Sequence, residues 1–162
     1  MLSRSLASFV FVTALAATSA GCATRYIPNT DVVDNKENRE VVKFCEIYRR
    51  AIEERDVGQI LSMVSANYYE DGGNVDPTDD MDYAGLRDWL NGRFLDTRAI
   101  RYEIRYRRVE KGERNRWFVV YTFSASYKIP GLKTEEEWHH TVADNRLEIE
   151  REGDAFKIVA GM

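Results

Sequence analysis

Four long runs of alternating apolar and polar residues dominate the C-terminal part of this 162-residue chain. They cover Arg98–Val109, Trp117–Tyr127, Thr134–Arg151 and Ala155–Gly161. A short polar turn containing glycine separates the first run from the second, and another separates the third from the fourth. Runs of this kind joined by tight turns predict antiparallel strands paired as hairpins. We expect the preceding residues to supply the helices that cover such a sheet.

Three helices are predicted upstream of the strands. Asp34, Asp56 and Asp82 each precede an apolar pattern of helical period, so each is predicted to cap a helix. The apolar positions include Phe44, Cys45 and Tyr48 in the first helix, Ile60 and Leu61 in the second, and Leu86, Trp89, Leu90 and Phe94 in the third. Between the second and third helices, Tyr68–Asp71 is predicted to be a brief extended segment. The sequence therefore predicts an α+β domain.

The third strand shows a change of phase. Its early apolar or aromatic positions, Trp138, His140 and Val142, are even-numbered, whereas Leu147 and Ile149 are odd-numbered. A bulge at residues 143–145 would place all five on one buried face, and bulges also curve a sheet. On this interpretation Trp138 and His140 face inward, and Asp144 and Asn145 lie at the bulge. His139 and His140 then point to opposite faces and cannot share one metal ion.

The N-terminus has the pattern of a secretory signal peptide. Arg4 precedes an uncharged run of 15 residues, Leu6–Ala20, which is shorter than the roughly 20 residues that span a bilayer as a helix. The run ends in Ser19-Ala20-Gly21-Cys22, which resembles the lipobox of bacterial lipoproteins. That resemblance implies that Cys22 becomes lipidated and anchors the protein to a membrane. An ordinary cleaved signal peptide is the alternative.

The predicted organisation is a signal peptide over residues 1–21, a lipidated tether over 22–35 and one domain over 36–162. Without residues 1–21 the chain carries 22 basic and 27 acidic residues, a net charge of −5, which argues against a nucleic-acid partner. Lipidation of Cys22 would leave Cys45 without an internal partner, so no disulfide is expected. We expect a location in the bacterial cell envelope, at the outer membrane facing the periplasm.

The order of helix, helix, short extended segment, helix and long antiparallel strands resembles the NTF2-like superfamily, including its SnoaL-like members. The resemblance covers residues 36–162. It rests on the early pattern around Phe44, Tyr48, Asp56 and Ile60, and on a late pattern from Arg146 to Ile158 that resembles the closing hairpin of that superfamily. The resemblance implies a cone in which three N-terminal helices pack on a curved antiparallel sheet, with a pocket between helix and sheet.

The same resemblance suggests candidate site residues. Tyr48 and Asp71 look like the oxyanion-binding tyrosine and general-base aspartate of ketosteroid isomerases in that superfamily. A core tyrosine and a solvated loop aspartate are the alternative. Further pocket candidates are Trp89, Trp138, His140, Asp144 and Asn145.

Two functions remain open at this stage. The first is a non-catalytic module that binds a small apolar ligand or an envelope protein; the second is a pocket enzyme of the ketosteroid isomerase, dehydratase or hydrolase type. The sequence has no metal-binding, phosphate-binding or dinucleotide-binding motif, so no metal or cofactor is expected. A homodimer formed through the sheet is a further expectation.

Overall fold

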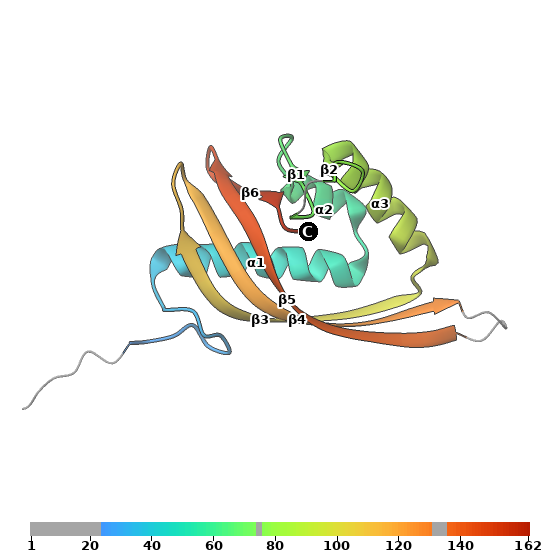
Figure 1. Cartoon of the computed structure of the whole chain (residues 1–162). Helices are drawn as coiled ribbons and strands as arrows, with labels where there is room; N and C mark the ends of the chain where they lie inside the picture. Colours follow the sequence, from blue (N-terminus) through green and yellow to red (C-terminus); the bar gives the residue numbers. More distant parts are fainter. Residues whose placement is uncertain (1–23, 74–75, 131–135) are drawn as a thin grey trace, which may run out of the picture.

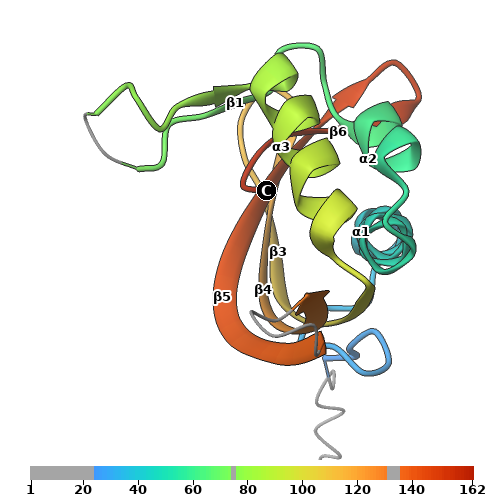
Figure 2. The ribbon, with the colours of Figure 1, turned by 90° about the vertical axis from the view of Figure 1, so that its right-hand side faces the viewer.

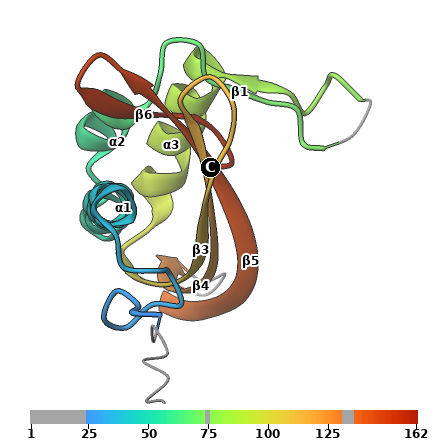
Figure 3. The ribbon, with the colours of Figure 1, turned by 90° about the vertical axis from the view of Figure 1, so that its left-hand side faces the viewer.

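Three helices lie on one side of a curved antiparallel sheet in the computed structural model, which describes residues 24–73, 76–130 and 136–162 (Figure 1). The elements in order are α1 (Lys36–Glu54), α2 (Val57–Met63), β1 (Tyr69–Glu70), β2 (Met81–Asp82), α3 (Tyr83–Asp96), β3 (Ala99–Lys111), β4 (Arg116–Pro130), β5 (Glu136–Glu152) and β6 (Ala155–Ala160). Figures 2 and 3, in which α1 is seen end-on, show β5 curving around the side opposite the helices. The α+β class and the three helices on a curved sheet are as predicted.

The main sheet has the strand order β3-β4-β5-β6, with every neighbouring pair antiparallel. The pairing of β4 with β5 runs without interruption, so the bulge predicted at residues 143–145 is wrong. Register shifts occur at two other places. Arg107 is an extra residue in β3 where it pairs with β4, and Val159 is an extra residue in β6 where it pairs with Glu148 and Ile149 of β5. The second shift explains why two consecutive residues of β6, Ile158 and Val159, are both buried.

The predicted phase change in β5 is also wrong, because the strand keeps a single alternation along its length. Leu147 and Ile149 are fully buried on the concave face, so the odd-numbered residues upstream face the same side. Trp138 and His140 therefore lie on the convex face, where the Trp138 side chain is 51% exposed. The even-numbered apolar residues that suggested a buried face are exposed.

Side-chain caps set the helix starts. Asp56 accepts a hydrogen bond from the backbone N–H of Gln59 at 2.8 Å, and Asp82 caps α3 in the same way, as predicted. The prediction for α1 is wrong by one residue, because Asn35 is the cap and accepts from the N–H of Asn38 at 2.8 Å. Asp34 instead forms an ion pair with Arg39.

The core lies between the three helices and the concave face of the sheet. Its fully buried side chains include Val41, Ile60, Leu86, Leu90, Val119, Tyr121, Leu147, Ile149 and Ile158. The segment before α1 joins this core, since Val32 is only 1% exposed and Tyr26 forms a bridge with Val33. The N–H of Asp31 also donates to the carbonyl of Tyr106 in β3 at 2.9 Å. Residues 24–35, predicted to be a tether, are therefore packed on the domain.

None of the described helices has the length and apolar character needed to cross a membrane. The predicted signal peptide and the lipidation site at Cys22 lie outside the described residues.

Candidate functional site

An open groove of about 1170 Å³ separates α3 from the concave face of β3, β4 and β5. Its lining is mainly apolar and aromatic: Ile52, Trp89, Phe94, Ile100, Tyr102, Phe123, Ala125, Tyr127, Ile129 and Pro130. Polar side chains at the groove come from α3, through Asp88, Arg93 and Asp96, and from β5, through His139 and Thr141. Apolar concave sites with a few polar groups are the usual form of small-molecule sites in proteins.

The groove exists because the sheet extends beyond the helices that cover it. β4 and β5 continue past the end of α1, so the inner face of their distal halves is left uncovered by α1 and faces α3 across the groove (Figure 1). The side chains Phe123, Ala125 and Tyr127 alternate along β4 on this inner face and are only partly buried. Trp89 is 46% exposed at the groove. The guanidinium carbon of Arg93 lies 5.6 Å from the centroid of the Trp89 ring. The tryptophan therefore lines the groove without closing it.

A layer of buried tyrosines lies beneath the groove. Tyr48 is 4% exposed on α1, and burial, reinforced by neighbouring Tyr102 and Tyr68, raises its pKa well above the usual value. Tyr102 lines the groove, and its hydroxyl forms a hydrogen bond with Tyr121. Tyr48 itself does not line the groove. The phenol proposed as an oxyanion donor is thus a core side chain that stays protonated.

The buried tyrosines predict a loss of stability at alkaline pH. Burial, and then the charge of Glu70, raises the pKa of Tyr68 from 10.0 to about 12. The fold favours the neutral phenol, so this stabilisation is complete below about pH 10 and is lost as the pH rises toward 12. At pH 11 we expect about 1 kcal/mol less unfolding free energy from Tyr68 alone. Urea denaturation at pH 9 and pH 11 measures this loss of unfolding free energy. Tyr68→Phe should lose less between the two pH values than the unmodified chain, and an equal loss would contradict the raised pKa of Tyr68.

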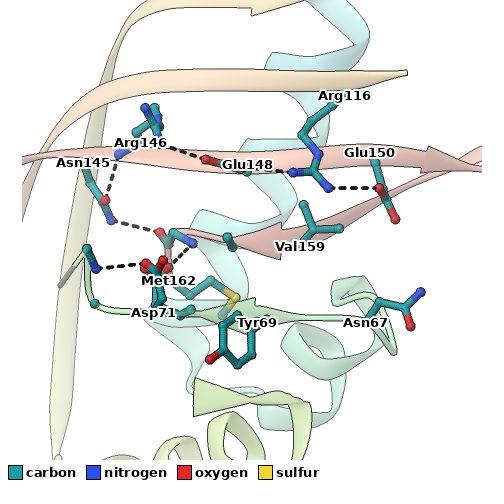
Figure 4. A pocket seen from close by; sticks show the side chains of 15 residues that line it. Asn67, Tyr69, Asp71, Arg116, Asn145, Arg146, Glu148, Glu150, Val159 and Met162 are labelled. Carbon is teal, nitrogen blue, oxygen red and sulfur yellow. Dashed lines mark hydrogen bonds and ion pairs between the residues drawn. The ribbon is translucent and has the colours of Figure 1, made fainter. Parts of the chain in front are cut away.

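A second, polar cavity of about 980 Å³ lies where β1, β5 and the C-terminal residues meet (Figure 4). Asn145 donates to the carbonyl of Gly161 at 3.1 Å and to the hydroxyl of Tyr121 at 3.2 Å. The carboxylate of Glu70 accepts from the N–H of Gly161 at 2.5 Å. Asp71 also lines this cavity, and its carboxylate accepts from the N–H of Gly73 at 2.9 Å. Glu70, Asp71 and Asn145 thus bind the backbone around the cavity, and the charged side chains of its lining pair with one another, as Arg116 does with Glu148 and Glu150.

The structure does not bring the proposed catalytic pair together. Tyr48 is buried beneath the groove, whereas Asp71 is exposed at the polar cavity and stabilises its own turn. No described cavity has both residues in its lining. In the isomerase mechanism one residue transfers a proton and the other stabilises the oxyanion that forms on the same substrate. Both residues must therefore contact one substrate molecule. This arrangement does not meet that requirement.

Three other candidates lie on the convex face of the sheet. Trp138 lies against Arg101, whose guanidinium carbon is 5.5 Å from the ring centroid. The Nδ1 atom of His140 is 3.0 Å from the hydroxyl of Ser126, and Asp144 accepts from the hydroxyl of Thr122 at 2.6 Å. The prediction that Trp138 and His140 line a pocket is therefore wrong. Trp89 in the groove and Asn145 in the polar cavity do line cavities.

Sequence reasoning missed His139 and Thr141. The ring of His139 stacks on Tyr127 with centroids 5.5 Å apart, and both β5 residues line the groove. Counting back in steps of two from buried Ile149 and Leu147 would have placed them on the concave face. Within the described ranges, no three His, Cys, Asp or Glu side chains gather as a metal site.

The sequence matches no protein-family profile and no curated protein. Solved structures do resemble the fold. A protein from Novosphingobium aromaticivorans assigned as a scytalone dehydratase aligns with a TM-score of 0.65 at 9% identity, covering 77% of this chain and 80% of that one. A dehydratase assigned to the NTF2-like family, from Streptomyces avermitilis, gives 0.62 at 11% identity, covering 76% and 92%. The chain has the NTF2-like fold. A ketosteroid isomerase-like protein from Erwinia carotovora atroseptica aligns similarly, with a TM-score of 0.61 at 11% identity over 79% and 95% of the two chains.

The NTF2-like fold accounts for the position of the groove but not for its use. TM-scores of 0.61–0.65 establish the shared arrangement of helices and sheet. Identities of 9–11% are too low to transfer residue roles from those proteins to this chain. Function must therefore be argued from the side chains that this chain places around its own cavities.

Proposed function

We propose that this NTF2-like domain is a non-catalytic binding module that takes a small apolar molecule into the groove between α3 and the sheet. The observation that carries the proposal is the lining of that groove, in which Phe123, Ala125, Tyr127 and Ile129 present a partly exposed apolar surface at the centre of the sheet. Its volume of about 1170 Å³ is somewhat larger than the roughly 300–1,000 Å³ of most small-molecule pockets, so the groove has room for a drug-sized ligand.

The distribution of polar groups supports binding rather than catalysis. The charged side chains of the groove, together with His139 and Thr141, are on exposed positions of α3 and β5, and Thr97 is the buried polar residue of the lining. The rest of the floor is aromatic and aliphatic. Asp88 is paired with Arg87 at 2.9 Å, and Arg93 lies over the ring of Trp89. An apolar floor with a polar rim favours desolvation of a ligand and leaves its polar end in water.

The second candidate is a pocket enzyme of the isomerase, dehydratase or hydrolase type. Structures of dehydratases and of a ketosteroid isomerase-like protein with the same fold favour it. Such an enzyme needs a proton-transfer group in contact with its substrate. In the groove this role would fall to His139, Asp88 or Asp96, because Tyr48 and Asp71 do not reach it.

We also propose that the protein acts in the bacterial cell envelope, anchored by a lipid on Cys22 at the outer membrane and facing the periplasm. The support is the signal-peptide pattern that ends at Cys22. An apolar ligand in this compartment would come from the membrane or from the periplasmic space beside it.

Filling the groove tests the binding proposal. Ala125 lies on the inner face of β4 and Ser124 on the outer face of the same strand. We expect Ala125→Trp to weaken binding of the uncharged fluorophore N-phenyl-1-naphthylamine by about tenfold or more, since the indole occupies the space of the ligand. Ser124→Trp is the matched control and should leave binding unchanged. Fluorescence titration measures both, and equal affinity of the two variants would refute the groove as the site.

A further inference from the structure

The short hairpin of residues 25–34, before α1, carries two apolar side chains on its exposed side. Tyr26 and Val33 face each other in an antiparallel bridge and are 53% and 45% exposed. Their chain neighbours, Ile27 and Val32, point to the other side and pack on the core. A hairpin with one face in water normally has polar residues on that face. Packing within the described chain therefore does not explain the exposed Tyr26–Val33 pair.

The hairpin is fixed on the domain. The N–H of Ile27 donates to the carbonyl of Val32 at 2.9 Å. The carboxylate of Asp31, at the turn, accepts from Arg105 of β3 at 2.5 Å and from Arg107 at 3.0 Å. The Tyr26–Val33 pair is thus presented by an ordered surface, so a contact made there does not first have to order a loop.

The place of the hairpin in the chain indicates what lies against the pair. Cys22, the proposed lipidation site, is four residues before Tyr26, and four residues span at most about 14 Å. The acyl chains of a lipidated cysteine enter the hydrocarbon core of the bilayer, so the cysteine itself lies in the polar headgroup layer, which is roughly 5–8 Å thick. An inserted lipid therefore holds Tyr26 in this layer or directly above it.

The headgroup layer also fits the chemistry of the hairpin. Tyrosine is enriched at membrane interfaces because its ring is apolar and its hydroxyl is polar. Arg25, exposed beside Tyr26, can donate hydrogen bonds to lipid phosphates. The carboxylates of Asp31 and Asp34 in the same segment are ion-paired with arginines, so neither approaches the phosphates as an unpaired negative charge.

We propose that the Tyr26–Val33 pair lies in the headgroup layer of the membrane that holds the lipid anchor, and that it fixes the orientation of the domain on that membrane. This contact rests on the proposed anchor at Cys22, because two apolar side chains alone bury too little surface for stable membrane binding. Figure 1 shows the hairpin beside the start of α1 and α3 at the other end of the domain. The groove of the proposed small-molecule site therefore lies away from the contact.

Fluorescence quenching on the lipidated chain tests the contact. The chain is reconstituted into vesicles of phosphatidylethanolamine and phosphatidylglycerol that include a lipid with a nitroxide on its headgroup. A nitrobenzoxadiazole fluorophore on Val33→Cys should lose at least about half of its emission, whereas the same fluorophore on Leu95→Cys, an exposed position of α3, should lose less than about a tenth. The buried thiol of Cys45 does not take the label. Equal quenching at the two sites would overturn the contact.

Two matched substitutions of tyrosine locate the contact. Tyr26→Asp, in the labelled Val33→Cys chain, is expected to lower the quenching by at least about half, because a carboxylate resists the loss of its hydration. Tyr69, on β1, is 53% exposed like Tyr26, and Tyr69→Asp should leave the quenching unchanged. Equal effects of the two substitutions would show that the hairpin is not the contact.

Flotation with the vesicles separates the contact from the anchor. Protein that floats and carries fatty acid, but whose label at Val33→Cys is not quenched, would overturn the contact and leave the anchor standing. Protein that neither floats nor carries fatty acid would overturn both. Sedimentation velocity of Cys22→Ser is run in parallel, and a dimer that Tyr26→Asp dissociates would show that the Tyr26–Val33 pair binds a second copy of the chain instead.

Discussion

Replacing Trp117 by alanine is expected to lower the free energy of unfolding by about 3–5 kcal/mol, the usual cost of deleting a large buried aromatic side chain. Trp117 lies on the concave face of β4 and is 3% exposed. Its ring meets Phe156 of β6 edge-on, with centroids 5.2 Å apart, and the side chains of Lys111 and Arg151 lie over it. The substitution would leave a cavity between α1 and two strands. Urea denaturation monitored by circular dichroism measures the loss.

Trp138→Ala is the matched control for Trp117→Ala. The two tryptophans lie on adjacent strands but on opposite faces of the sheet, and Trp138 is 51% exposed on the convex side. Its packing partner is Arg101, so truncation should cost no more than about 1 kcal/mol. Equal losses at the two positions would mean that the faces of the sheet are misassigned.

Local signals in the sequence were sufficient for most of the secondary structure. The aspartates at 56 and 82 cap their helices because a carboxylate before an apolar period satisfies free N–H groups whatever the tertiary context. The glycine turn at Gly153 has φ of +61°, a conformation that favours glycine, so the closing hairpin could be located from the sequence. Features that depend on a few neighbouring residues were therefore predictable.

The errors concern which surfaces are covered. Trp138, His140 and Val142 form an alternating pattern that is typical of a buried strand face, yet they are exposed, because the helices lie on the other side of the sheet (Figure 2). An alternation of apolar and polar residues shows that the two faces of a strand differ in polarity. Which of the two faces is buried depends on where the helices lie and end. The segment 24–35 was misjudged for a similar reason, since its single buried Val32 has no periodic partner.

The candidate site was only partly accessible to sequence reasoning. Tyr48 and Trp89 were placed on the correct helices, but whether two side chains reach one cavity depends on the curvature of the sheet. That curvature is associated with bulges at Arg107 and Val159, neither of which has a sequence signal such as an isolated glycine. The groove became visible only when the extension of β4 and β5 beyond α1 was known.

The proposed anchor predicts an all-or-none change in partitioning. Cys22→Ser is expected to abolish labelling by radioactive fatty acid and to move the protein from the detergent phase to the aqueous phase, because stable anchoring requires acyl chains that the serine cannot carry through a thioether or thioester. The domain should remain folded, since the first buried core residue of the described chain is Val32, well after Cys22 in the sequence. Circular dichroism of the soluble variant checks this.

Cys45→Ala separates lipidation from the loss of a cysteine. Cys45 is 1% exposed on α1, and burial raises its pKa, so its thiol is neither accessible nor ionised. The variant should lose some stability yet keep its fatty acid and its partitioning into detergent. Because residues 24–35 pack on the domain, few residues separate Cys22 from the folded protein, and the proposed lipid would hold the domain close to the membrane surface. Retained labelling in Cys22→Ser, or labelling that depends on Cys45, would contradict the anchor.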